Sequence, residues 1–197
     1  APGDADPLTN IRQLAKDVAQ PQPEHGTLHH SIKIAGGFLR YERHGEFYRI
    51  SLVATSRLKT GVEADSIVPA EWIAALPGER LVAIHTHVSV GGKRRMTETQ
   101  IANVFGHEDV AASLVSQGLA TIWTDFRIGA DGFTRILVED HGLSPLRLGR
   151  VVRRIHEIET YRMMVLLALP VARKTQAALA RLEAGLSETV QRMPVAQ

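Results

Sequence analysis

The spacing of apolar residues predicts a chain whose last quarter is one long helix. From Ser144 onward, apolar side chains recur every three or four residues, as they do on the apolar face of a helix. Ser144 is suited to cap such a helix, and Pro145 is suited to its first turn. We therefore expect a helix over 144–197, with a kink near Pro170 because proline lacks a backbone donor.

Residues 1–143 combine short helical patterns with strand patterns. Helices are expected at 10–18, 68–76 and 97–105, the last with a capping box of Thr97 and Gln100. Strands are expected at 27–35, 37–44, 46–55, 80–90, 111–116, 119–128 and 132–140. The pattern predicts an α+β domain over 1–143, with an antiparallel-rich mixed sheet of about six or seven strands, followed by the long helix as a second part.

The predicted helix is longer than a domain of this size is wide. At 1.5 Å per residue, nearly 50 residues extend about 70 Å. Its far end must therefore project or find a partner, and we expect a homo-oligomer that forms through this helix. An apolar run at 163–172 is too short for a membrane span of about 20 residues, so no span is expected in this chain.

Composition excludes several classes of function. The chain has 197 residues, 23 Lys and Arg against 21 Asp and Glu, and a net charge of +2 without a long basic run. Nucleic acid is therefore not an expected partner. The absence of cysteine excludes disulfides, thiolate metal sites and a cysteine nucleophile.

The stretch "FLRYERHGEFYRI" at 38–50 alternates aromatic and ionisable residues. One interpretation is a His–Glu pair that transfers a proton or binds a cation. The other is ion pairing between side chains on the surface of a sheet. Acidic residues of the long helix offer a further interpretation, a junction between the domain and the helix. The residues predicted to form this junction are Arg40, Glu42, Arg43, His44, Glu46, Asp125, Arg127, Arg135, Glu157, Glu159, Tyr161 and Arg162.

Two further groups have side chains suited to ions. A hard cation such as Mg²⁺ is favoured by carboxylates, and two histidines on one face of a strand can share a metal. The candidate metal ligands are His85, His87, Asp125 and Asp131, with His107 and His30 as additional ligands. Lys93, Arg94 and Arg95 follow two glycines and are candidates for binding an anion. Turn chemistry and solvated loops account for the same residues, so both interpretations stay open.

Three stretches together resemble a known family. "YERHGEF" (41–47), "WTDFRIGADGFTRILV" (123–138) and "GLSPLRLGRVVRRIHEIETYRMMVLLALPVAR" (142–173) are similar to the uncharacterised DUF3422 family. The resemblance covers the chain from about Gly36 onward. Gly45 departs from the hydroxyl residue expected there, and it favours a tight turn or a bulge over a continuous strand.

The resemblance implies a membrane-anchored protein whose anchor follows further helical sequence. The chain would then be the soluble part, on the cytoplasmic side of a membrane. This layout is similar to that of CorA-type magnesium channels, and it implies an oligomeric or regulatory domain linked to divalent cation transport or sensing. No catalytic constellation is evident, so we lean against an enzyme.

Two alternatives remain. A metal- or phosphate-dependent enzyme would use His44, His85, His87, Asp125 and Asp131, which must then converge. A protein-binding module would instead expose an apolar patch along 163–172.

Overall fold

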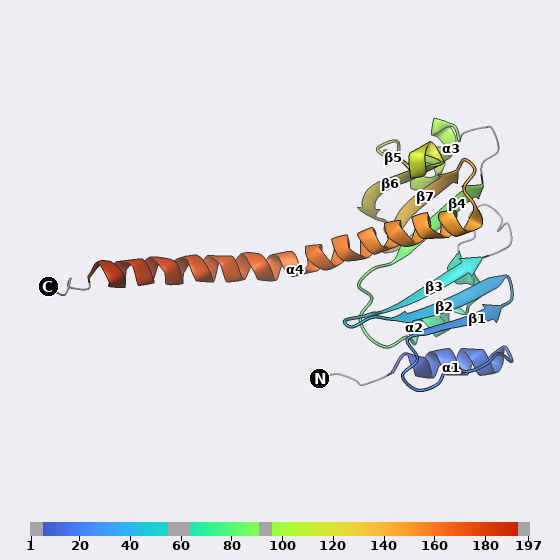
Figure 1. The fold of residues 1–197 in the computed structure, drawn as a ribbon, viewed down its shortest axis with the longest axis horizontal. Helices are drawn as coiled ribbons and strands as arrows, with labels where there is room; N and C mark the ends of the chain where they lie inside the picture. Colours follow the sequence, from blue (N-terminus) through green and yellow to red (C-terminus); the bar gives the residue numbers. More distant parts are fainter. Residues whose placement is uncertain (1–5, 55–63, 91–95, 193–197) are drawn as a thin grey trace. The chain divides into compact units, whose positions relative to one another are not determined.

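The computed structural model describes residues 6–54, 64–90 and 96–192 (Figure 1). The helices are α1 (Leu8–Asp17), α2 (Ala70–Ala74), α3 (Glu98–Phe105) and α4 (Pro145–Gln191), with two short 3₁₀ helices, η1 (Ala64–Ile67) and η2 (Ser116–Gly118). The strands are β1 (His29–Ile34), β2 (Gly37–Arg43), β3 (Tyr48–Ala54), β4 (Ile84–Val90), β5 (Ala111–Val115), β6 (Ala120–Ile128) and β7 (Thr134–Asp140). They confirm the α+β class and the long final helix, and the seven strands form two sheets.

The chain divides into two compact units, residues 1–80 and residues 81–197. The sequence pattern placed a boundary at 143, where the helical period begins. Helix α4 does begin at Pro145, capped by Ser144 as expected, but it belongs to the same compact unit as strands β4–β7. The first part of α4 is therefore a component of the second unit.

The first unit is a three-stranded antiparallel sheet, β1-β2-β3, covered by α1. Helix α1 buries Leu8 and Ile11 against Leu39 and Tyr41 of the sheet, and all four side chains are fully inaccessible to solvent. The predicted hairpin between β1 and β2 is present, with Gly36 in the turn at a φ of 85°. Apolar burial on one face of this sheet thus accounts for the core of the unit.

Gly37 lies close to the backbone of β3. A Cβ atom on Gly37 would lie 2.0 Å from the carbonyl oxygen of Val53, whereas a Cβ atom on Gly45 would have no neighbour within 4 Å. Because backbone must move to admit the methyl group, we expect Gly37→Ala to lower the free energy of unfolding by about 1–3 kcal/mol. Urea unfolding should show this loss, and Gly45→Ala should differ from the unaltered chain by less than about 0.5 kcal/mol. Equal effects at both glycines would contradict the assigned register.

The second unit is a four-stranded sheet in the order β4-β7-β6-β5, with a helix on each face. Strand β4 is parallel to β7, and the other pairs are antiparallel. Leu137 packs against α3, whereas its neighbours Ile136 and Val138 point to the opposite face and pack against α4. The predicted Thr97 capping box opens α3. The middle strands β6 and β7 are therefore covered on both faces, by α3 and by the first turns of α4.

Helix α4 continues through Pro170 and far beyond the sheet against which it begins. At 47 residues it is about 70 Å long. Leu148, Val152 and Ile155 pack against the sheet, whereas Val165, Leu182 and the other large apolar residues after Met164 are exposed. By length and composition α4 is also a candidate membrane span, and its most apolar 18-residue window, of mean hydropathy 1.2, is not buried.

Candidate functional site

A buried ion pair within α4, between Glu159 and Arg162, lies at the contact between this helix and the sheet of the second unit. The Glu159 side chain is 5% exposed and accepts two hydrogen bonds from Arg162, from Nε at 2.7 Å and from Nη2 at 2.6 Å. It also accepts a hydrogen bond from Thr134 Oγ1 at 3.0 Å. One turn earlier, His156 Nε2 lies 2.6 Å from Thr86 Oγ1 of β4. These polar contacts join three elements, so they fix the rotation of α4 on the sheet.

Glu159 and Arg162 were both predicted from the sequence as junction residues. The Glu159 carboxylate is buried, and the Arg162 guanidinium compensates its charge. The hydrogen bonds to Glu159 raise the pKa of the Arg162 guanidinium above its ordinary value, so the arginine stays charged. A buried carboxylate without its cation is strongly unfavourable. The positive charge of Arg162 therefore compensates the Glu159 carboxylate, whose burial would otherwise destabilise the fold.

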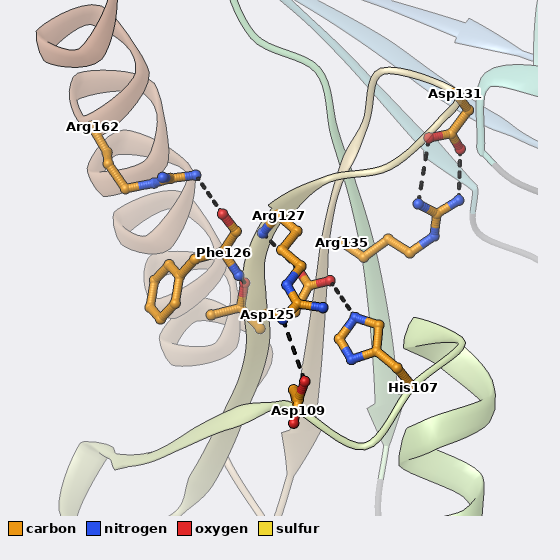
Figure 2. A network of polar contacts seen from close by, with 9 residues as sticks. His107, Asp109, Asp125, Phe126, Arg127, Asp131, Arg135 and Arg162 are labelled. Carbon is orange, nitrogen blue, oxygen red and sulfur yellow. Dashed lines mark hydrogen bonds and ion pairs between the residues drawn. The ribbon is translucent and has the colours of Figure 1, made fainter.

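Strand β6 is interrupted by an irregularity next to Arg162 (Figure 2). Phe126 has a φ of 56°, a conformation that costs a residue other than glycine about 1–2 kcal/mol. The Phe126 N–H donates to Thr124 Oγ1 at 3.2 Å, and the Arg127 N–H donates to Asp125 Oδ1 at 3.0 Å. The Phe126 carbonyl accepts from Arg162 Nη2 at 3.4 Å, and its ring centroid lies 5.8 Å from the Arg162 guanidinium carbon. Arg162 thus supports both the buried carboxylate and the strained strand.

Asp125 and His107 form a second polar contact, on the α3 side of the sheet (Figure 2). His107 follows the left-handed Gly106 that ends α3, and its Nε2 lies 3.1 Å from Asp125 Oδ2. Its Nδ1 is buried and has no hydrogen-bond partner in the described parts of the chain. An imidazole–carboxylate pair is the combination that general bases use. Here the second nitrogen does not reach solvent, and the pair ties the segment after α3 to β6.

Asp131 and Arg135 form an ion pair at the hairpin between β6 and β7 (Figure 2). Arg135 Nη2 donates to Asp131 Oδ2 at 2.6 Å, and the Phe133 N–H donates to Asp131 Oδ1 at 3.1 Å. These hydrogen bonds lower the pKa of the Asp131 carboxyl from its ordinary value. The arrangement is that of a hydrogen-bonded turn, with Gly132 at a φ of 80°.

The candidate metal ligands lie in different surroundings. His85 stacks on Phe133 with ring centroids 3.8 Å apart, and His87 is exposed. Asp125 and Asp131 have the partners described above, and His30 lies 3.0 Å from the carbonyl oxygen of Pro21. Within the described residues, no group of three or more histidine, aspartate or glutamate side chains is placed to hold a metal ion. Lys93, Arg94 and Arg95 lie outside the described residues.

The remaining predicted junction residues fall in both units. In the first unit, Glu42 is 7% exposed and lies 3.0 Å from Arg40 and 3.9 Å from Arg49. In the same unit Arg43 lies 4.0 Å from Asp6, His44 stacks on Phe47, and Glu46 is exposed. In the second unit Arg153 pairs with Glu157, Arg127 pairs with Asp109, and Tyr161 is exposed. A contact between the two sets stays a prediction.

Sequence reasoning missed Phe126 and Thr134 as parts of the α4 junction. Phenylalanine gives no local signal for a positive φ, and Thr134 is 25 residues away from Glu159. The pattern that did mark this region was the pair Glu159 and Arg162, three residues apart on a predicted helix.

The second unit is thus a two-sided α+β sheet whose last helix packs on it through apolar residues and through hydrogen bonds from Glu159, Arg162 and His156. The chain belongs to a family described as "Protein of unknown function (DUF3422)", whose model matches residues 4–197. Neither the curated proteins nor the solved structures gave a match.

Proposed function

We propose that the chain is a non-enzymatic assembly module in which α4 pairs with α4 of a second copy. The observation that carries this proposal is a stripe of residues on α4, here called the seam, that repeats at alternating intervals of three and four. The seam consists of Tyr161, Val165, Ala168, Ala172, Thr175, Leu179, Leu182, Leu186 and Thr189. Over four heptads this is the spacing of a coiled coil.

The exposure of the seam supports pairing with another helix. Tyr161, Val165, Leu179, Leu182 and Leu186 are each between 53% and 71% exposed. Burying a leucine side chain contributes about 1.5–3 kcal/mol of stability. A partner helix that covers the seam would bury several such side chains, and this burial would favour association.

A second copy of this chain is the partner that the seam fits. No residue of the seam is charged, so two seams meet without repulsion between like charges. The two helices are also equal in length, and Pro170 lies on the opposite side of α4 from the seam, at the outward position of the heptad. A kink there leaves the paired face uninterrupted.

The hydrogen bonds between α4 and the sheet give this assembly a defined geometry. Because Glu159 bonds to Thr134 and Arg162 bonds to Phe126, the rotation of α4 on the sheet is fixed, and the direction in which the seam faces is set by the second unit. Pairing of the seams would therefore hold two sheets in a fixed relation. This property suits a scaffold or a coupling domain, in line with the oligomeric domain expected from the sequence.

Sedimentation equilibrium of the unaltered chain tests the proposal. The average mass should rise from that of one chain toward that of two or more as concentration increases from the nanomolar to the micromolar range. The same chain should gain helix signal and thermal stability with concentration, because association stabilises the associated form by mass action. A single-chain mass at every concentration would refute it.

A further inference from the structure

A groove on the second unit, separate from the seam, has the features of a peptide-binding site. It lies between strand β5 and the first turns of α4 and has a volume of about 730 Å³. Ala112 and Ser113 line it from the strand, and Arg147, Arg150 and Arg154 line it from the helix. Ile122 and Ile155 contribute apolar surface.

The strand wall of the groove is an unprotected edge. Strand β5 is the last in the order β4-β7-β6-β5, so one side of its backbone has no neighbouring strand in the described parts of the chain. Four of its five residues are exposed, and the sequence AASLV contains no charge and no proline. Soluble proteins usually shield a free edge with charged residues or proline, because the unpaired N–H and C=O groups of the edge can otherwise bond to another strand.

The helix wall is strongly basic. Four arginines and one glutamate line the groove, and Glu157 is paired with Arg153 at 2.8 Å. Arg147, Arg150 and Arg154 are exposed, and no ion pair engages them within the described residues. Their intervals of three and four place them on one face of α4, over about 10 Å of helix. Three guanidinium groups therefore face the same groove with their charges available.

We propose that this groove binds an extended acidic segment of another protein, which adds to β5 as a further strand. Backbone hydrogen bonds to the free edge would supply affinity, as in other cases of strand addition. Side chains of a strand alternate, so acidic residues at every second position lie about 7 Å apart and fall within reach of the arginines. Apolar residues at the intervening positions would point to the other face of the sheet.

Charge and chemistry select this occupant over the others. A second copy of the chain would bring the same arginines to the groove and be repelled by them. A nucleic acid would pair with the guanidinium groups but would make no use of the backbone of a strand edge. An acidic peptide in extended conformation satisfies the edge and the charges together.

The test uses a fluorescently labelled seven-residue peptide alternating glutamate and valine, titrated with the full chain at low salt. Fluorescence anisotropy should show saturable binding. Arg150→Glu with Arg154→Glu should weaken it at least about tenfold, as expected for two lost and reversed charge pairs. The matched control, Arg173→Glu with Arg181→Glu on the exposed part of α4, should change the affinity less than about twofold. Circular dichroism checks that both variants are folded.

Two control peptides distinguish hydrogen bonding to the edge of β5 from attraction by the arginines. The same peptide N-methylated at every residue has no backbone donors and should not bind, and a peptide alternating lysine and valine should not bind either. No binding of the acidic peptide at millimolar concentration, equal binding of the N-methylated peptide, or tighter arginine-dependent binding of a single-stranded oligonucleotide would each overturn the proposal.

Because the variant Leu179→Glu with Leu182→Glu leaves the groove intact, it should bind the peptide as the unaltered chain does. Failure of the seam and failure of the groove are therefore distinguishable.

Discussion

Replacing Arg162 by methionine should destabilise the second unit by about 3 kcal/mol, the lower end of the cost of leaving a buried charge unpaired. The substitution leaves the Glu159 carboxylate, 5% exposed, with Thr134 as its remaining hydrogen-bond donor among the residues that the structure describes. It also removes the contact of Arg162 with Phe126, whose positive φ is already unfavourable. Urea unfolding followed by circular dichroism measures the loss.

Two further variants test whether the loss of stability comes from the Glu159–Arg162 pair. Arg153→Met removes an exposed ion pair with Glu157 on the same helix and should cost no more than about 0.5 kcal/mol. Glu159→Leu combined with Arg162→Met removes both charges, so it should recover most of the stability lost in Arg162→Met alone. If Arg162→Met and Arg153→Met were equally mild, the Glu159–Arg162 pair would not stabilise the contact of α4 with the sheet.

Placing glutamates in the seam should abolish self-association. Leu179→Glu with Leu182→Glu puts two charges per chain at positions expected to be buried between helices, where each leucine contributes about 1.5–3 kcal/mol. The dissociation constant should rise at least about 100-fold, since each 1.4 kcal/mol is a factor of ten. Sedimentation velocity at a fixed concentration should show a single-chain species.

The matched control for the seam lies on the same helix. Leu166→Glu with Leu167→Glu replaces two leucines that are 45% and 53% exposed but lie outside the seam, and it should leave the association intact. If this control variant dissociated and the seam variant did not, the apolar run at 163–172 would be the contact surface instead.

Local signals in the sequence predicted the parts of the fold that depend on neighbouring residues. Ser144 before Pro145 marked the start of α4, and Thr97 with Gln100 marked the capping box of α3, because each cap is formed by residues within one turn. The strands were predicted for the same reason, since alternation is a property of adjacent residues.

Features that depend on how distant segments pack were not predictable. The order β4-β7-β6-β5 makes β5 an edge, and the alternation within AASLV does not contain that information. Glu159 meets Thr134 only because α4 returns across the sheet, and Phe126 adopts a conformation that its own side chain disfavours. The candidate site was therefore half predicted, through Glu159 and Arg162 on the helix, and its partners on the sheet came from the structure.

The central claim is that two α4 helices meet along the seam, and disulfide cross-linking tests it most directly because the chain contains no cysteine. Chains carrying Val165→Cys and Leu182→Cys are mixed under mild oxidation, with Leu167→Cys as the control outside the seam. Pairing through the seam predicts rapid cross-linking, either of each variant with itself in a parallel pair or of one with the other in an antiparallel pair centred between Ala172 and Thr175. Cross-linking of the seam variants no faster than that of Leu167→Cys would contradict the account.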